Sequence, residues 1–352
     1  MRLKDFGYNE NLERFRVDNN LKDFEIGRVT TEHKERFIVK TDTAEYDAEI
    51  TGNMRFTAKG REDFPAVGDW VALTTYDSDL AIIHKILPRS SIIKRQAVGH
   101  FGEIQIIATN VDYAFLVQAV DRDYNINRLE RYLTICNASR VNPIIVLSKI
   151  DLIDETRLDE ILSGIKARIK DIPLIAISNE TPSGFEAIKK FIEKGKTYCI
   201  LGSSGVGKST LLNNLAGKSV MKTDKISESI NRGRHVTSYR ELIVLDNGGI
   251  LIDNPGMREV GIADSASGLE ATFNSIFSLS KKCKFKDCTH AHEVGCAVID
   301  AVEKGEIDKD SYENYLKMER EKAHFETSVH EKKRKEKIFG KIVKNFKKDM
   351  KK

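Results

Sequence analysis

The chain has 352 residues, of which 40% are hydrophobic and 31% are charged. This length is too great for one ordinary core and fits two or three domains. No apolar run approaches the length of a transmembrane helix, and the N-terminus lacks the apolar stretch of a secretory signal. These features argue against a membrane or secreted protein, so we expect a cytoplasmic one with no membrane partner.

The first predicted domain, residues 1–98, contains short alternating strands separated by turn residues. Examples are Phe24–Thr30, Arg36–Lys40 and Asp69–Thr74. Several short strands at such spacing indicate a small barrel. About five strands fit an OB-like β-barrel, a fold that often binds nucleic acid. A barrel that only packs against its neighbour is the alternative.

The second predicted domain, residues 99–264, alternates apolar strands with helices. Tyr113–Gln118 and Pro143–Ser148 are typical of buried parallel strands, which indicates a doubly wound α/β domain. The expected helices are Asn127–Ala138, Glu155–Ile169 and Gly184–Lys194.

The central motif of this domain is Gly202–Ser209, which matches strand, G-x-x-x-x-G-K-S, helix. Its glycines let backbone N–H groups converge on phosphate oxygens at a helix N-terminus. Lys208 is placed to reach the β- and γ-phosphates, and the Ser209 hydroxyl to bind Mg²⁺. The expected nucleotide contacts here are Gly202, Ser203, Ser204, Gly205, Val206, Gly207, Lys208, Ser209 and Thr210.

A second motif supports this interpretation. The apolar strand Gly249–Ile252 leads into D-x-x-G, with Asp253 placed to hold Mg²⁺ through a water and Gly256 to present its N–H to the γ-phosphate. The preceding Asp-Asn-Gly-Gly is a hairpin signal that joins Leu242–Leu245 to Ile250–Ile252.

The loop Ser148-Lys149-Ile150-Asp151 predicts which nucleotide base the site binds. A carboxylate accepts both guanine donors, N1–H and N2–H₂, so Asp151 favours guanine, and the Lys149 stem would cover the ring. Ser148 departs from the usual N-K-x-D motif, from which we expect lower base affinity. Ser178 ends another strand and is placed to offer a backbone N–H to the guanine carbonyl. An ATPase or small-molecule kinase remains an alternative.

The order of these loops is unusual, because the base-reading loops precede the phosphate loop. All of them meet at one end of a sheet if the chain is circularly permuted. In this the sequence resembles the circularly permuted GTPases called ribosome small subunit-dependent GTPase A (RsgA or YjeQ). The resemblance covers nearly the whole chain and implies a barrel, a permuted GTPase domain and a zinc-bearing C-terminal domain.

Two further expectations rest on the resemblance. The segment Gly233–Thr237 is similar to the family's G-R-H-T-T switch motif, with Val236 in place of the first threonine. Thr237 is then expected to contact Mg²⁺ or the γ-phosphate. His235 is expected to help position the attacking water, although a switch-loop histidine without a chemical role is an equal alternative.

The third predicted domain, residues 265–352, is mostly helical. It holds three of the five cysteines, and a clustered odd set in a reducing compartment suggests metal binding. Three thiolates and one imidazole suit a closed structural zinc site. The family pattern selects His290 over the neighbouring His292. The expected ligands are Cys283, Cys288, His290 and Cys296.

The C-terminal tail, residues 331–352, has eleven Lys or Arg against three Glu or Asp, a net charge of +8 in a chain of +4. Such a basic tail suggests a polyanionic partner, or else a solvated helix end. The resemblance implies the small ribosomal subunit and its rRNA, late in assembly. We expect a monomer that binds GTP and GDP, and whose zinc domain moves with nucleotide state.

Hydrolysis is expected to depend on that partner. Many GTPases place a glutamine after D-x-x-G to orient the attacking water, and Met257 stands there in this chain. We therefore expect a GTPase that is slow alone and is stimulated by the small subunit. The rival hypothesis is a nucleic-acid-binding protein whose slowly hydrolysing nucleotide site is regulatory.

Overall fold

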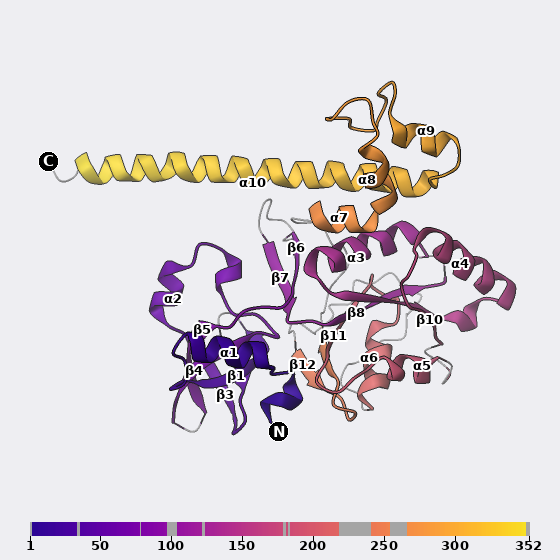
Figure 1. Ribbon diagram of the computed structural model, residues 1–352. Coiled ribbons are helices and arrows are strands. Elements are labelled where there is room, and N and C mark those ends of the chain that lie inside the picture. Colours follow the sequence, from indigo (N-terminus) through magenta and orange to yellow (C-terminus); the bar gives the residue numbers. More distant parts are fainter. Residues whose placement is uncertain are drawn as a thin grey trace, which may run out of the picture. The chain divides into compact units, whose positions relative to one another are not determined.

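The computed structural model describes residues 2–33, 36–77, 79–96, 104–121, 124–178, 181, 184–217, 241–253 and 266–349 (Figure 1). By compactness the chain divides into two units. One comprises Met1–Ile93 with Ile106–Glu259, and the other Lys94–Gln105 with Val260–Lys352. The barrel and the nucleotide-binding segments lie in the same unit. The division into three domains, with boundaries after residues 98 and 264, therefore remains a proposal.

Five strands at the N-terminus close into a barrel. They pair in the order β1, β2, β3, β5, β4, and β4 pairs back with β1. β3 and β5 are parallel, whereas the other pairs are antiparallel, and a closed five-stranded barrel is the OB-like arrangement expected from the sequence. The strands are β1 (Glu25–His33), β2 (Arg36–Lys40), β3 (Glu45–Ile50), β4 (Trp70–Tyr76) and β5 (Leu80–Ile86).

Period-two alternation fills the barrel interior. Phe37 and Val39 of β2, and Tyr46, Ala48 and Ile50 of β3, are buried, while the residues between them are more exposed. Other elements of this region are η1 (Leu3–Phe6), α1 (Glu10–Asp18), α2 (Gly52–Thr57) and η2 (Arg61–Asp63). The strands β6 (Ile92–Gln96) and β7 (Ile104–Thr109) form a separate two-stranded sheet.

Six more strands form the nucleotide-binding sheet in the order β10, β9, β8, β11, β13, β12. The first five run parallel, and β12 is antiparallel to β13. The carboxyl ends of the parallel strands therefore share one edge, where α/β proteins place their ligands. The strands are β8 (Tyr113–Ala119), β9 (Asn142–Ser148), β10 (Leu174–Ala176), β11 (Thr197–Leu201), β12 (Glu241–Val244) and β13 (Ile250–Asp253).

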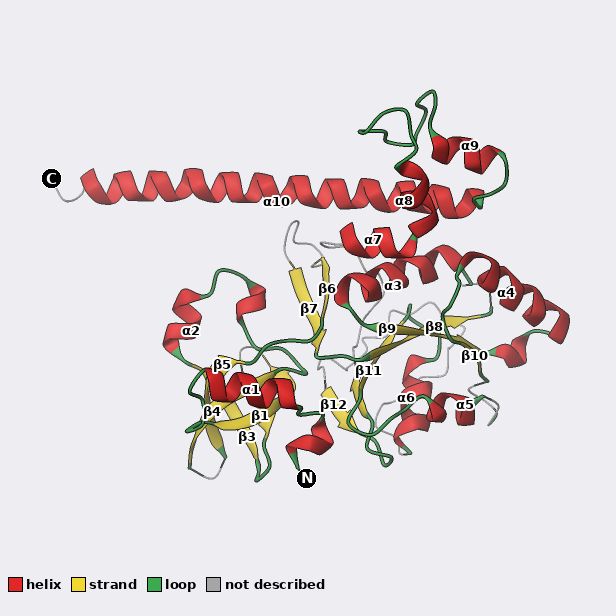
Figure 2. Cartoon of the chain, viewed as in Figure 1, coloured by secondary structure: helices red, strands yellow, loops and turns green. Residues whose placement is uncertain are grey.

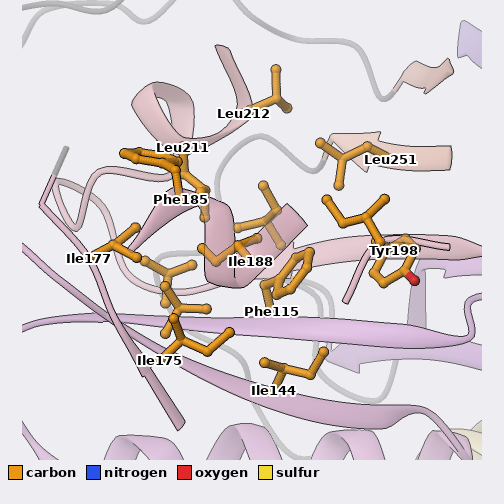
Figure 3. Close-up of a cluster of buried hydrophobic side chains, with 14 of the residues drawn as sticks. Phe115, Ile144, Ile175, Ile177, Phe185, Ile188, Tyr198, Leu211, Leu212 and Leu251 are labelled. Carbon is orange, nitrogen blue, oxygen red and sulfur yellow. The ribbon is translucent and has the colours of Figure 1, made fainter. Parts of the chain in front are cut away.

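Helices cover both faces of this sheet. In Figure 2, α3 (Ile126–Ser139) and α4 (Glu155–Arg168) lie on one face, and α5 (Phe185–Lys190) and α6 (Lys208–Ala216) on the other. Under α5 and α6, apolar side chains from the helices meet those of the strands in one cluster (Figure 3). Burial of each large side chain stabilises the sheet by about 1.5–3 kcal/mol.

Two of the expected helices match closely, and the third is shorter. We expected a helix over Gly184–Lys194, but α5 ends at Lys190. The next residues turn back toward β11, with Gly195 at a φ of 74° and its N–H donated to the Gly248 carbonyl. This turn ends the helix because its backbone groups bond to the β12–β13 hairpin instead.

A buried arginine joins the barrel to the nucleotide-binding sheet. The Arg28 guanidinium, on β1, is 1% exposed and lies 5.4 Å from the centre of the Trp70 ring. It donates to the carbonyls of Phe6 and Gly68 and, at 2.9 Å, to Thr197 Oγ1 at the start of β11. Burial lowers its pKa to about 10, which leaves it charged at neutral pH. A buried charge with these partners fixes the two segments together.

The second unit is helical and has its own core. Its helices are α7 (Ala266–Thr272), α8 (Asn274–Ser280), α9 (Ala297–Glu303) and the long α10 (Lys309–Asp349). Leu269, Phe273, Ile276, Val298 and Met318 are buried in one cluster. Within the described ranges, no helix is both long and apolar enough to cross a bilayer. The fold class predicted from the sequence is confirmed.

Candidate nucleotide site and metal centre

The phosphate loop connects the buried strand β11 to α6. Gly205 and Gly207 have φ angles of 81° and 90°, which favour glycine. At Gly202 a Cβ atom would lie 2.5 Å from the Val117 carbonyl oxygen, so the neighbouring strand also requires a glycine there. The loop therefore has the tight backbone that lets N–H groups converge on phosphate oxygens.

The expected phosphate contacts lie together around this loop. Lys208 Nζ donates to the Ser203 carbonyl at 2.5 Å, which folds the ammonium back across the loop. Ser209 and Thr210 lie in the first turn of α6, where the helix dipole adds positive potential. Ser204 and Gly205 are exposed, whereas Val206 is buried beneath them.

The guanine loop begins where β9 ends, and it is tied to the phosphate loop. The fully buried Ser148 hydroxyl donates to the Val206 carbonyl at 2.6 Å. Lys149 follows with a φ of 62° and leads into η3 (Ile150–Leu152). The serine that departs from the usual motif thus makes a backbone contact that fixes one loop against the other.

Asp151 is held by the neighbouring loop. Its Oδ1 accepts from the Ser178 hydroxyl at 2.5 Å, and Ser178 is 2% exposed just beyond β10. We expected Ser178 to act through its backbone N–H, and the structure shows this further role of its side chain. The carboxylate of Asp151 itself is exposed, as a group that accepts from a base must be.

Lys149 has a partner that the sequence did not indicate. Its Nζ lies 2.8 Å from Asp121 Oδ2, and both side chains are about four-fifths buried, at 20% and 22% exposure. Asp121 follows β8, the strand between β9 and β11. The ion pair therefore sets the direction of the Lys149 stem, which we expected to cover the guanine ring.

The magnesium side of the site is described in part. Asp253 ends β13, which pairs in parallel with β11 through Cys199 and Ile252, so its carboxylate belongs to the edge that carries the phosphate loop. The predicted hairpin between β12 and β13 is confirmed. His235, Thr237, Gly256 and Met257 lie outside the described residues.

A second residue missed by the sequence analysis is Arg128, in the first turn of α3. Its Nη1 donates to the Ser203 hydroxyl at 3.1 Å. No motif marks this position, because α3 precedes the phosphate loop by about 70 residues in the chain. Only the parallel pairing of β8 with β11 brings the two segments together.

The expected metal ligands converge in the second unit. One ligand atom from each of Cys283, Cys288, His290 and Cys296 lies within 4.8 Å of every other. Cys283 Sγ is 3.8 Å from Cys296 Sγ, and His290 Nδ1 is 3.6 and 3.4 Å from these two atoms. Tetrahedral zinc with ordinary bond lengths requires sulfur–sulfur edges of about 3.8 Å and sulfur–nitrogen edges of about 3.6 Å.

The surroundings of the cluster favour metal binding by the histidine. Burial lowers the His290 pKa, which favours the neutral imidazole that a metal requires. The carbonyl of His290 accepts from the Tyr312 hydroxyl of α10. Glu293 accepts backbone N–H groups from Thr289 and Ala291, which pins the loop on both sides of His290. His292 is exposed and stands outside the cluster.

The remaining two cysteines are core residues. Cys136 in α3 and Cys199 in β11 are fully buried in the first unit. Burial raises the pKa of Cys136 to about 12 and that of Cys199 well above its usual value. Both thiols therefore stay protonated at neutral pH, unlike the thiolates that bind metals.

Comparisons with known families agree with this geometry. The family model described as RsgA GTPase matches residues 86–263. A second model, described as 50S ribosome-binding GTPase, matches residues 197–330. The second description names the large ribosomal subunit and the first names no partner, so the choice of subunit needs its own test.

Curated relatives match almost the whole chain. The Bacteroides thetaiotaomicron protein named small ribosomal subunit biogenesis GTPase RsgA 1 is 40% identical over 345 residues, which cover 97% of this chain and 96% of that protein. A protein of the same name from Oceanobacillus iheyensis is 42% identical over 303 residues, 86% of each chain.

Solved structures give the same fold. The crystal structure of YjeQ from Thermotoga maritima superposes with a TM-score of 0.61 at 25% identity, over 84% of this chain and 96% of that one. YloQ, described as a circularly permuted GTPase, superposes with a TM-score of 0.59 at 24% identity over 88% and 96%. The permuted arrangement inferred from the loop order is thereby confirmed.

Proposed function

Since this chain belongs to the RsgA GTPase family, we propose that it hydrolyses GTP during late maturation of the small ribosomal subunit. The GTPase activity follows from the family. The proposal adds the partner and the step, which the curated relatives' names give for those proteins. The small subunit would bind the GTP form and stimulate its hydrolysis.

The observation that carries the nucleotide assignment is the contact between the two loops. Ser148 Oγ donates to the Val206 carbonyl at 2.6 Å, so the guanine-reading loop and the phosphate loop form one connected surface. Ser178 positions the Asp151 carboxylate on the same side. One nucleotide that carries both guanine and phosphates matches this pair of loops.

The residues have distinct proposed roles. The loop N–H groups and Lys208 bind the phosphates, and Ser209 binds Mg²⁺ directly. Asp253 would hold the same ion through a water, and Thr237 would complete its ligands. The ion supplies charge neutralisation at the β- and γ-phosphates. Gly256 would donate its N–H to the γ-phosphate, and His235 would help to position the attacking water.

The proposed partner, the small ribosomal subunit, is supported by the chemistry of this chain as well as by its similarity to the curated relatives. A closed OB-like barrel and a zinc-bearing helical unit are modules that often bind RNA. The tail beyond residue 330 has a net charge of +8, which attracts a polyanion such as rRNA. Met257 offers no group that orients water, so the bound subunit would complete the site.

The second unit is proposed to bind one structural zinc. Cys283, Cys288, His290 and Cys296 would hold it, and four protein ligands would leave no position for a reacting water. The ion would therefore hold the loop between α8 and α9 in shape rather than take part in hydrolysis. We also propose that the protein acts in the cytoplasm as a monomer. Light scattering of the purified protein would then give a mass near 39.8 kDa.

The test is GTP hydrolysis at rising concentrations of purified small subunits. We expect a stimulation of about 100-fold, the lower range of what one positioned general acid or base contributes. Large subunits serve as the matched control and should leave turnover nearly unchanged. Lys208→Ala should abolish turnover in both mixtures.

Four results would count against the proposal. Equal stimulation by large subunits would move the function to the other partner. No stimulation at all would favour an RNA-binding protein with a regulatory nucleotide site. Full stimulated turnover in His235→Ala would remove that residue from the chemistry, and equal subunit affinity with GTP and GDP would remove the switch.

A further inference from the structure

The first turn of α3 sends an arginine to the phosphate loop. Arg128 is half-buried, and its Nη1 lies 3.1 Å from Ser203 Oγ. Ser203 follows Gly202 directly, so it is the first side chain of the loop. A hydrogen bond from a charged donor is about twice as strong as a neutral one, which makes this contact significant for a loop of small residues.

Ser203 is held from two sides by cations. Arg128 binds its side chain, and Lys208 Nζ donates to its backbone carbonyl. Lys208 is also the group that turns toward the β- and γ-phosphates when a nucleotide binds. Arg128 is then the contact that keeps Ser203 in place while the lysine shares its donors with the phosphates.

The turn that carries Arg128 is itself clamped. Arg168, at the end of α4, donates to Asn127 Oδ1 at 2.6 Å and to Glu130 Oε2 at 2.8 Å. Glu130 is 3% exposed, so this ion pair lies in the protein interior. Because Arg168 holds Asn127 and Glu130 on either side of Arg128, the backbone that carries the Arg128 guanidinium is fixed in place.

We propose that Arg128 is a positioning residue that holds the phosphate loop, through Ser203, in the geometry that binds the β-phosphate. The proposal deepens the proposed function and rests on the guanine nucleotide site described above. Arg128 acts on the loop and not on the base. Asp121, which lies between β8 and α3, pairs with Lys149 on the guanine side.

The structure therefore predicts two different responses along the series GMP, GDP and GTP. Arg128→Met should weaken GDP and GTP binding by about tenfold, the loss of one charge-assisted hydrogen bond, and GMP binding by less than about twofold. Asp121→Asn should weaken all three equally, because every member carries the same base. Isothermal titration calorimetry of each nucleotide measures both.

A double-mutant cycle separates positioning from a general loss of charge. Ser203→Ala alone should reproduce the selective loss of GDP and GTP, and Arg128→Met combined with Ser203→Ala should add nearly nothing. Arg128→Lys keeps the charge and should recover part of the affinity. Arg157→Met is the matched control, since the Arg157 side chain is 57% exposed on α4 and forms an ion pair with Glu160 on the same helix.

Three outcomes would overturn the inference. Equal losses for GMP, GDP and GTP in Arg128→Met would place its effect on the fold or on the base, and additive losses in the cycle would separate it from Ser203. If wild type bound GTP but Arg128→Met were unchanged, this inference alone would fail. A wild type that binds no guanine nucleotide would instead remove the proposed function.

Discussion

The nucleotide site and the metal centre are built in opposite ways. The four metal ligands lie within 14 consecutive residues, Cys283–Cys296. The nucleotide residues extend from Asp121 to Asp253, and β8, β9, β11 and β13 bring them together at one edge of the sheet. The metal centre is therefore built from one short loop, whereas the nucleotide site depends on the complete core of the sheet.

Because of this difference, the two sites are stabilised by different interactions. The nucleotide loops rest on a buried apolar cluster that includes Phe115, Leu211 and Leu251, so burial of apolar side chains stabilises the sheet that carries them (Figure 3). The metal loop packs against the small core of the second unit, and its four expected ligand atoms lie within 4.8 Å of one another, where a bound cation would hold them together. The two sites should therefore fail independently.

The largest expected effect comes from metal removal. Structural zinc contributes about 10–16 kcal/mol to the folding of small zinc domains, so chelation should unfold the loop between α8 and α9. Amide hydrogen exchange should then rise sharply over residues 281–305. GTP affinity should change by less than about twofold, since the two sites lie in separate compact units.

The matched comparison for metal removal is Cys283→Ser with His292→Ala. The first should lose the ion, measured by elemental analysis, and the second should keep one ion per chain because His292 stands outside the cluster. A large loss of GTP affinity on chelation would show that the two sites are coupled. Loss of the ion in His292→Ala would replace the proposed ligand set.

A smaller effect tests the connection within the nucleotide site. Ser148→Ala removes the hydrogen bond to the Val206 carbonyl and leaves that carbonyl buried. One neutral hydrogen bond contributes about 0.5–1.5 kcal/mol, so GTP should bind roughly 2- to 13-fold more weakly. The metal content should not change. Ser148→Thr keeps the hydroxyl and should stay near wild type, and a loss as large as that of Ser148→Ala would contradict the assigned contact.

The features that could be predicted from the sequence are those encoded in short stretches of the chain. Gly202–Ser209 and the spacing from Cys283 to Cys296 each have a local physical reason. The structure places the first between β11 and α6 and brings the four metal-ligand atoms within 4.8 Å of one another. The barrel, the permuted order and the helices α3 and α4 were also predicted, because strand and helix periodicities are local.

Contacts between distant segments were not predictable in this way. Arg28 and Arg128 belong to no motif, and their roles appear only when the Arg28 side chain of β1 reaches β11 and α3 meets the phosphate loop. The expectation for Ser148 was incomplete for the same reason. From the sequence alone the serine lacked some contacts of an asparagine, whereas the fold gives its hydroxyl a backbone partner.

The account depends most on the claim that Asp151, far from the phosphate loop in sequence, reads the base of the nucleotide that this loop holds. Xanthine keeps the N1–H donor but has an oxygen in place of the N2 amine, so an asparagine amide complements it as a carboxylate complements guanine. The decisive measurement is competition of XTP against GTP in Asp151→Asn. We predict that GTP affinity falls about 10- to 100-fold and that XTP becomes the preferred ligand. An unchanged preference for GTP would contradict the account.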